Sequence, residues 1–135
     1  MNLLVDTNII LVVLQKREPY YRDSATVWKL CEINRATGFV TTLTLANLVY
    51  VMRRELTPAM IREVLTQLSL IFEFADFTGT DLNKAAILEW EDFEDAIQNV
   101  IAERIRADYI VTRNVRDFNS SKITALTPTE LITKL

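Results

Sequence analysis

Short hydrophobic runs alternate along the chain with longer stretches in which apolar residues recur at helical spacing. The short runs predict strands at residues 3–5, 39–40, 71–74 and 108–111, and a fifth, minor strand at 123–126. The longer stretches predict helices at residues 9–14, 24–36, 43–54, 58–70, 81–90 and 93–106. Strands that alternate with helices form a parallel sheet covered on both faces. The pattern therefore predicts an α/β fold with three α/β/α layers and a short central parallel sheet of four to five strands.

Cap residues mark where several of these helices begin or end. Thr42 is expected to cap the third predicted helix, and Thr57 followed by Pro58 marks the start of the fourth. Gly38 stands after the second helix, where it is expected to serve as a C-terminal cap. The Thr-Pro-Thr-Glu segment at residues 127–130 is a capping box that opens a last, short helix.

Nothing in the sequence marks a domain boundary or a membrane segment. No linker, repeat or low-complexity tract interrupts the chain, so residues 1–135 are expected to form a single domain. The longest apolar run, residues 9–14, is far shorter than the roughly 20 residues of a membrane helix, and no basic segment precedes a signal-peptide core. A cytoplasmic location without membrane contact is therefore expected.

The composition restricts the chemistry that the chain can perform. The sequence has 18 acidic and 15 basic residues, a single cysteine and no histidine. The commonest general base is therefore absent, and an ordinary zinc site cannot be assembled. Any catalysis must run on carboxylates, which bind hard cations such as Mg²⁺ or Mn²⁺. Cys31 lies among apolar helical residues and is expected to fill the core.

Polar residues gather where the first and fourth predicted strands end. Asp6 and Asn8 follow the first of these strands, and Thr112, Asn114 and Asp117 follow the fourth. Open parallel sheets bind ligands outside the carboxyl ends of their strands. A carboxylate at the end of a buried strand is costly unless it is solvated, paired or bound to a cation. Asp6 is therefore either a metal ligand or the N-terminal cap of the helix that follows it.

Two aspartates open the sixth predicted helix. Asp92 and Asp95 are three residues apart, so their side chains share one face of the helix and can converge on a cation. The alternative is structural, because acids in the first turn cap a helix and complement its dipole. Glu91 and Glu94 point elsewhere on the helix and are expected to be solvated.

Three motifs, taken together, resemble the PIN domain family over essentially the whole chain. They are a hydrophobic strand ending in Asp-Thr-Asn at residues 3–8, Asp-Phe-Glu-Asp-Ala at 92–96, and Thr-Arg-Asn-x-x-Asp-Phe at 112–118. The resemblance implies a PIN-like fold and a metal-dependent ribonuclease similar to the VapC-type toxins of bacterial toxin–antitoxin pairs. It also implies a cognate antitoxin and a homodimer, neither of which can be read from these residues.

The resemblance further implies which side chains act in phosphodiester hydrolysis. The carboxylates that carry catalysis and hold one or two Mg²⁺ or Mn²⁺ ions are Asp6, Asp92, Asp95 and Asp117. The side chains that position ligands or phosphate are Asn8, Asn47, Thr112 and Asn114. The residues that contact RNA phosphates are Arg113 and Arg116, with Lys16, Arg17, Arg53 and Arg54 as extensions. For each of these basic residues a solvated surface charge is the alternative.

One position departs from the family's pattern. Many members have a glutamate in the helix after the second strand, where this chain has Asn47. The Asn47 carbonyl can still ligate a cation or hold its water, but it brings no charge. The structural alternative is that Asn47 is only a helix residue that bonds to its surroundings. The missing acid also makes a second function plausible, a catalytically impaired PIN domain that binds RNA or another protein without cleaving.

A third hypothesis is phosphoryl transfer through an aspartyl phosphate. Asp6 ends a first strand, as the nucleophile of a haloacid-dehalogenase-like phosphatase does. Such enzymes have a second aspartate two residues further on, and this chain has Asn8 there. The hypothesis is therefore the weakest of the three.

Overall fold

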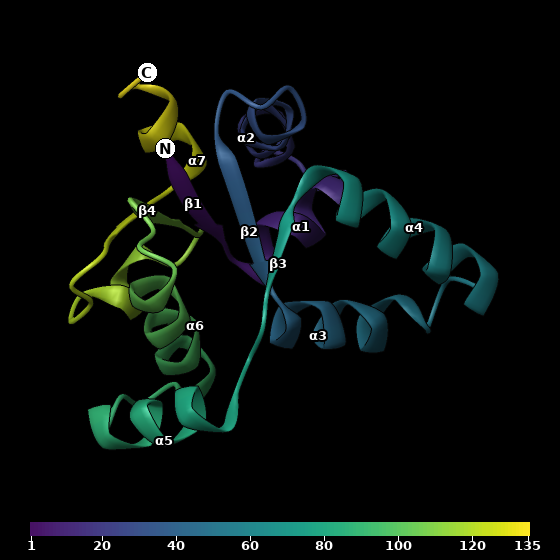
Figure 1. Cartoon of the computed structure of the whole chain (residues 1–135). Coiled ribbons are helices and arrows are strands. Elements are labelled where there is room, and N and C mark those ends of the chain that lie inside the picture. Colours follow the sequence, from purple (N-terminus) through teal and green to yellow (C-terminus); the bar gives the residue numbers. More distant parts are fainter.

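Five parallel strands form the central sheet in the computed structural model, which describes residues 1–135 (Figure 1). The strands are β1 (Asn2–Val5), β2 (Thr37–Thr41), β3 (Glu73–Ala75), β4 (Tyr109–Val111) and β5 (Thr124–Leu126). Their order in the sheet is β3-β2-β1-β4-β5. The chain therefore moves outward from β1 to one edge and then returns to build the other half from β4. Ligand sites of open α/β sheets lie at such a reversal, which here falls between β1 and β4.

Helices cover both faces of the sheet, which confirms the predicted three-layer α/β/α fold. The helices are α1 (Thr7–Leu14), α2 (Tyr21–Glu32), α3 (Thr42–Met52), α4 (Pro58–Ile71), α5 (Gly79–Leu88), α6 (Phe93–Arg104), the 3₁₀ helix η1 (Val115–Phe118) and α7 (Pro128–Ile132). None of them is long and apolar enough to cross a membrane.

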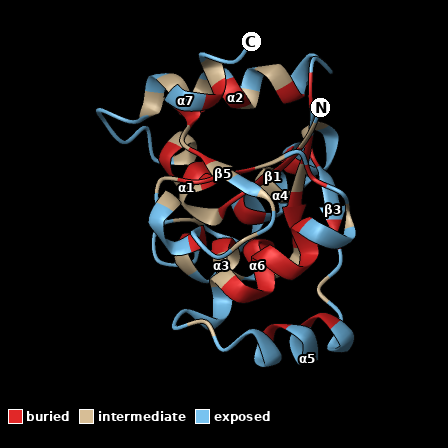
Figure 2. Cartoon of the chain, turned by 90° about the vertical axis from the view of Figure 1, so that its left-hand side faces the viewer, coloured by how far each residue is buried: buried red, intermediate tan, exposed pale blue.

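Alternating side chains of the strands build a separate core on each face. Leu3 and Val5 pack in the larger core, which holds residues of α1 to α4 and α7. Leu4, between them, points to the opposite face and packs against α6 and η1. Figure 2 shows α6 buried along much of its length, and every residue from 96 to 102 is buried. Helix α6 is thus held firmly, which fixes the position of the acids at its start.

The sequence pattern placed the elements well and some of their ends wrongly. The five strands, the Thr57–Pro58 start of α4 and the capping box that opens α7 are confirmed. The cap of α3 is Thr41, because this residue still has extended backbone and its hydroxyl accepts the Thr44 N–H. Gly38 is not a helix cap but lies within β2, where an added Cβ would come within 2.6 Å of the Cys31 sulfur. Cys31 is buried in the core, as predicted.

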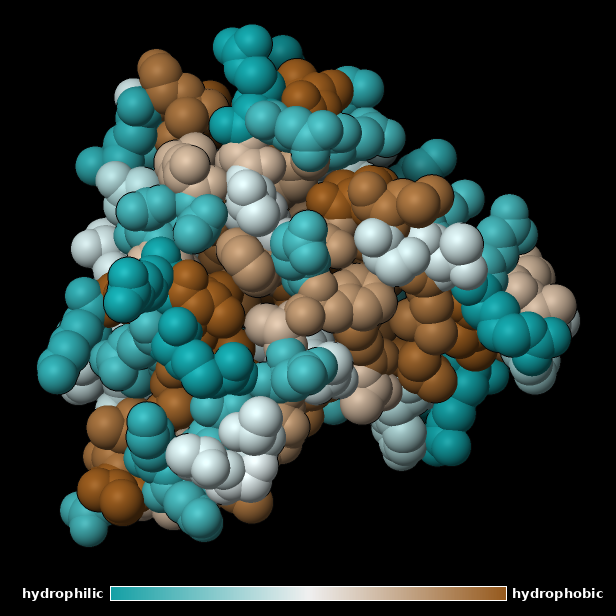
Figure 3. Space-filling model, viewed as in Figure 1, coloured by the Kyte–Doolittle hydropathy of each residue, from teal (hydrophilic) through white to brown (hydrophobic).

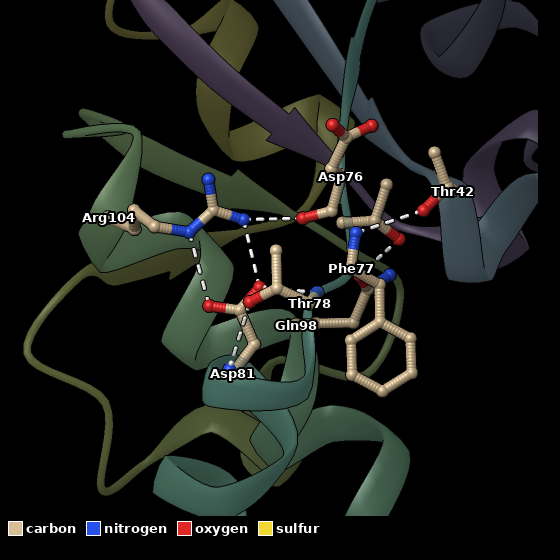
Figure 4. A network of polar contacts seen from close by, with 8 residues as sticks. Thr42, Asp76, Phe77, Thr78, Asp81, Gln98 and Arg104 are labelled. Atoms are coloured by element: carbon tan, nitrogen blue, oxygen red, sulfur yellow. Dashed lines mark hydrogen bonds and ion pairs between the residues drawn. The ribbon is translucent and has the colours of Figure 1, made fainter.

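An ion pair attaches the outlying helix α5 to α6 (Figure 4). The Arg104 guanidinium donates to both carboxylate oxygens of the buried Asp81, through Nε at 3.1 Å and Nη2 at 2.9 Å. Nη2 also donates to the backbone carbonyl of Asp76. Thr78 completes the arrangement, since its hydroxyl and the Asp81 side chain form a capping box at the start of α5. The carboxylate of Asp81 is therefore fully engaged in structure.

Candidate active site

Asp6 leaves the end of β1 at the reversal of strand order, and its carboxylate is almost fully buried. Asp6 is the N-terminal cap of α1, which confirms one of the two roles predicted for it. Its hydrogen-bond donors are the backbone N–H of Thr7 and the side chains of Asn8, Gln98 and Thr112. All four donors are neutral, and the shortest contact is 2.8 Å. Burial raises the pKa of Asp6, and the negative charge of Asp92 adds to the rise although the hydrogen bonds oppose it.

A buried polar network joins the elements around Asp6. The Gln98 amide on α6 donates to the Thr44 hydroxyl at 2.9 Å, and its carbonyl accepts from the Thr41 hydroxyl at 2.8 Å. The Thr44 hydroxyl also lies 2.8 Å from that of Thr7. Sequence reasoning did not find this network. The available signal was a polar residue, Gln98, within an apolar run of α6.

Asp92 and Asp95 lie at the start of α6. The Asp92 carboxylate accepts the Asp95 backbone N–H at 3.0 Å, so Asp92 is the N-terminal cap of α6. The pKa of Asp95 is raised to about 7, first by desolvation and then by negative charges on four neighbours. In order of effect the neighbours are Asp92, Asp6, Asp117 and Glu94. Acids from β1, α6 and η1 thus act on one half-buried carboxylate.

The loop after β4 brings the remaining predicted residues to this edge. Asn8 accepts the Arg113 backbone N–H at 3.3 Å, and Thr112 accepts that of Asn114 at 3.1 Å. Asp117 follows in η1, a short helix that the sequence pattern did not reveal. Asp92, Arg116 and Asp117 line one surface hollow of about 450 Å³ between η1 and the start of α6.

Glu94 is exposed, as its place on the helix predicted, but it has a partner on another helix. Its carboxylate accepts a hydrogen bond of 2.6 Å from the Asn47 amide of α3. Asn47 lies one turn after Thr44 and Glu94 one turn before Gln98, so the pair continues the contact between α3 and α6. Desolvation raises the pKa of Glu94, and the charges of Asp6 and Asp92 raise it further. Glu94 is therefore a fifth member of the acidic group, hereafter the acid cluster: Asp6, Asp92, Glu94, Asp95 and Asp117.

The basic residues predicted to meet RNA occupy different environments. The Arg113 guanidinium lies 3.8 Å from the centre of the Tyr20 ring, and Arg116 is exposed beside Asp117. The four basic residues predicted to extend the RNA contact are all exposed, which agrees with the alternative that they are solvated surface charges: Lys16, Arg17, Arg53 and Arg54. The chain contains two ion pairs, Lys29–Glu32 and Asp81–Arg104, and neither involves the acid cluster.

Residues 2–116 match the sequence model of the PIN domain family. The chain belongs to the PIN domain family. No curated protein matches the sequence. Membership in this family argues against the haloacid-dehalogenase-like phosphatase hypothesis.

Solved structures share the fold of this PIN domain at low sequence identity. VapBC2 from Rickettsia felis, bound to a DNA fragment from its promoter, aligns with a TM-score of 0.70 and 18% identity, over 94% of this chain and 98% of that chain. A toxin–antitoxin complex from Klebsiella pneumoniae aligns with a TM-score of 0.71 and 19% identity, over 93% and 96%. VapC20 of Mycobacterium tuberculosis, a Sarcin-Ricin loop cleaving toxin, aligns with a TM-score of 0.62 and 13% identity, over 80% and 86%.

The donor chemistry of the acid cluster fits a hard divalent cation. Each of its five side chains offers carboxylate oxygens, the ligand type that Mg²⁺ and Mn²⁺ prefer. No cationic side chain pairs with any of them. The carboxylates do not yet form a ligand set, since no three acids are arranged around one point. Asp6 and Asp92 both accept backbone hydrogen bonds as helix caps, so a bound cation would have to share them with these donors.

Proposed function

We propose that this PIN domain is a Mg²⁺- or Mn²⁺-dependent ribonuclease that hydrolyses RNA phosphodiester bonds. The observation that carries the proposal is that acids at the end of β1, at the start of α6 and in η1 all act by their negative charge on Asp95, while none of them forms an ion pair. Neighbouring like charges repel, and a divalent cation removes the repulsion. The family and the Sarcin-Ricin loop cleaving toxin VapC20, whose fold is similar, support the choice of RNA.

In this proposal Asp6, Asp92, Asp95 and Asp117 hold the cation. When bound, a divalent ion lowers the pKa of water and offsets the charge that develops on the phosphate. Thr112 and Asn8 fix the Asp6 carboxylate by hydrogen bonds of 2.8 and 3.2 Å, so it is already oriented before a ligand arrives. No histidine is needed in this proposal, because carboxylates can hold the cation that supplies this chemistry.

Glu94 can supply the negative charge that is missing from α3, where Asn47 replaces the glutamate of many family members. Asn47 cannot bring a negative charge, but it holds the Glu94 carboxylate with a hydrogen bond of 2.6 Å. The charge of Glu94 acts on Asp95, and the charges of Asp6 and Asp92 act on Glu94. We therefore include Glu94 among the cation-binding acids, with Asn47 as its positioning residue.

The proposal is tested by incubating the purified protein with RNA in Mg²⁺, in Mn²⁺ and in EDTA. We expect cleavage with either cation and none in EDTA. Asp95→Asn should abolish cleavage, whereas Glu63→Gln, on the exposed surface of α4, should leave it unchanged. Cleavage that persists in EDTA or in Asp95→Asn would show that the activity does not come from this site.

A second candidate function is a PIN domain that binds RNA or a partner protein without cutting. Asn47 favours it, as does the absence of three acids arranged around one point. Asn47→Glu separates the two candidates. If the parent is inactive and Asn47→Glu cleaves RNA with Mg²⁺, the natural protein is impaired. If the parent cleaves and Glu94→Gln weakens Mn²⁺ binding, Glu94 supplies the acid and the non-cleaving candidate fails.

We also propose that the protein is the toxin of a type II toxin–antitoxin pair. The structures of similar fold include toxin–antitoxin complexes. Figure 3 shows hydrophobic side chains gathered over α3 and α4, and an apolar groove of about 530 Å³ lies between α1, α3 and α4. Co-expression with the product of the neighbouring gene, followed by copurification, tests the pairing. A homodimer is tested by light scattering of the protein alone.

A further inference from the structure

A polar pocket of about 350 Å³ lies beside the acid cluster, where the start of α2, the loop after β4 and the start of α7 meet. We call it the Tyr20 pocket. The residues that matter for its chemistry are Tyr20, Ser24, Arg113, Asn114 and Thr127, together with Asp23, whose carboxylate accepts a hydrogen bond from the Thr129 hydroxyl. A site of this volume lies at the lower end of the range for small ligands, about 300–1,000 Å³. It therefore takes one small polar unit rather than a folded segment.

Two polar groups of this pocket have no hydrogen-bond partner. The Ser24 side chain is 0% exposed, and its hydroxyl is unpaired. The Arg113 Nε is also buried and unpaired. Most buried polar groups in folded proteins are satisfied, so two orphans in one pocket call for a ligand that pairs with them. Neither ion pair of the chain uses Arg113, and its guanidinium is held in place by the Tyr20 ring.

The Tyr20 pocket is continuous with the proposed catalytic edge. Arg113, Asn114 and Thr127 line both this pocket and a neighbouring hollow. Arg116 and Asp117 line that hollow and also the one beside the start of α6. A path of shared residues thus leads from Asp117, whose charge acts on Asp95, to Tyr20. An extended strand cut at the acid cluster would pass two arginines on this path before it reached the pocket.

We propose that the Tyr20 pocket binds one nucleotide of the RNA strand, next to the phosphodiester bond that the acid cluster hydrolyses. The inference rests on the proposed function. Arg113 donates to a phosphate of this nucleotide, since guanidinium groups pair with phosphate oxygens. The hydroxyl of Ser24 and the amide of Asn114 hydrogen-bond to its sugar or base. The Tyr20 ring holds the planar guanidinium in place, and the exposed part of the ring adds an aromatic surface on which a base stacks.

Tyr20→Ala and Ser24→Ala test the proposal, with Tyr50→Ala as the matched control. Tyr50 is an exposed tyrosine on α3 whose ring carries the Arg53 guanidinium at 4.0 Å, so it repeats the Tyr20–Arg113 pair outside the pocket. The kcat and KM for a ten-nucleotide RNA are measured with Mg²⁺. The Kd of the same RNA is measured by fluorescence anisotropy in an Asp6→Asn background, with and without inorganic phosphate as a competitor.

We expect Tyr20→Ala to raise KM and Kd about tenfold and to leave kcat nearly unchanged, because the pocket binds the strand away from the reacting phosphate. Ser24→Ala should raise Kd severalfold without lowering thermal stability, because the hydroxyl has no partner in the free protein. Wild-type-like Kd values for both variants, equal to that of Tyr50→Ala, would overturn the proposal while RNA cleavage stands. Complete displacement of RNA by millimolar phosphate would assign the pocket to a free anion and would also overturn it. A parent protein that neither binds nor cleaves RNA would instead refute the proposed function.

Discussion

Two aspartates are almost fully buried in this PIN domain, and their surroundings are opposite. Asp81 on α5 is 2% exposed and faces the guanidinium of Arg104. Although burial opposes it, this pairing holds the pKa of Asp81 below its ordinary value. Asp6 at the end of β1 is 8% exposed and meets four neutral donors. Burial therefore leaves its pKa raised.

The difference in their partners indicates different roles for the Asp81 and Asp6 carboxylates. A buried charge is tolerated when a counterion and hydrogen bonds satisfy it, and Arg104 provides both for Asp81. The neighbours of Asp6 include a further negative charge, Asp92, and no positive one. The chain thus provides a counterion for its structural aspartate, whereas it provides none for Asp6, which agrees with the proposed cation site. The same substitution at the two positions should therefore have opposite consequences.

Asp6→Asn should produce the largest loss of activity. Asparagine keeps the size of the side chain and removes the charge that the proposed cation requires. We expect RNA cleavage to fall about a thousandfold, since a bound metal contributes several kcal/mol to catalysis. Thermal stability without cations should change little, because the removal of a buried charge without a counterion offsets the loss of hydrogen bonds from the donors that face the new amide group. Initial rates and melting temperatures measure both effects.

The control for this comparison is Asp76→Asn, at an exposed aspartate whose carboxylate makes no hydrogen bond within the chain. It should change neither activity nor stability. Full activity in Asp6→Asn would contradict the assignment of Asp6 to the cation site.

Asp81→Asn should show the reverse behaviour. The Arg104 guanidinium would lose its charged acceptor, and we expect the free energy of unfolding to fall by about 2–3 kcal/mol. The acid cluster does not include Asp81, so the cleavage rate per folded molecule should remain at the parent value. Urea titration gives the unfolding energy, and rates normalised to the folded fraction give the activity. A midpoint equal to that of Asp76→Asn would show that the Asp81–Arg104 pair contributes nothing to stability.

The contrast between these aspartates also shows where sequence reasoning works. Asp6 stood out because a carboxylate directly follows a buried strand, and the position of that strand is set by local hydrophobic pattern. The same pattern predicted the five strands and their parallel arrangement. Caps were predictable where one residue type decides them, as at Thr57. Between Thr41 and Thr42, two identical side chains in succession, only the backbone conformation decides.

Contacts between distant elements could not be read from the sequence. Glu94 points away from Asp95 on an isolated helix, and only the packing of α6 against α3 brings it to Asn47. The pairing of Gln98 with Thr41 and Thr44 depends on the same packing. The prediction of an acidic site rested on the joint motif pattern rather than on any one residue. The Tyr20 pocket was missed because α2, α7 and the loop after β4 are far apart along the chain.

The smallest expected effect is a dependence of stability on pH that comes from Asp95. This residue shares the acidic environment of Asp6, so it extends the comparison between Asp6 and Asp81. Its pKa of about 7 in the folded protein exceeds the value of 3.8 in a free chain. The folded state therefore binds more protons between these values. The stability that this group contributes is complete below about pH 4 and is lost as the pH rises through about 7. Asp81, with a lowered pKa, changes in the opposite sense and loses its contribution only in acid.

Without divalent cations, we expect the parent to be less stable at pH 8 than at pH 5 by about 1–2 kcal/mol on account of Asp95, after screening by solvent. Asp95→Asn should remove most of this difference, and Glu63→Gln should retain it. Mg²⁺ should restore stability to the parent at pH 8 and have little effect at pH 5, where Asp95 is protonated and a poor ligand. Melting temperatures across this pH range, with and without Mg²⁺, measure each step. A parent whose stability responds to Mg²⁺ equally at both pH values would place the bound ion away from Asp95, and the contrast between Asp6 and Asp81 would then need another cause.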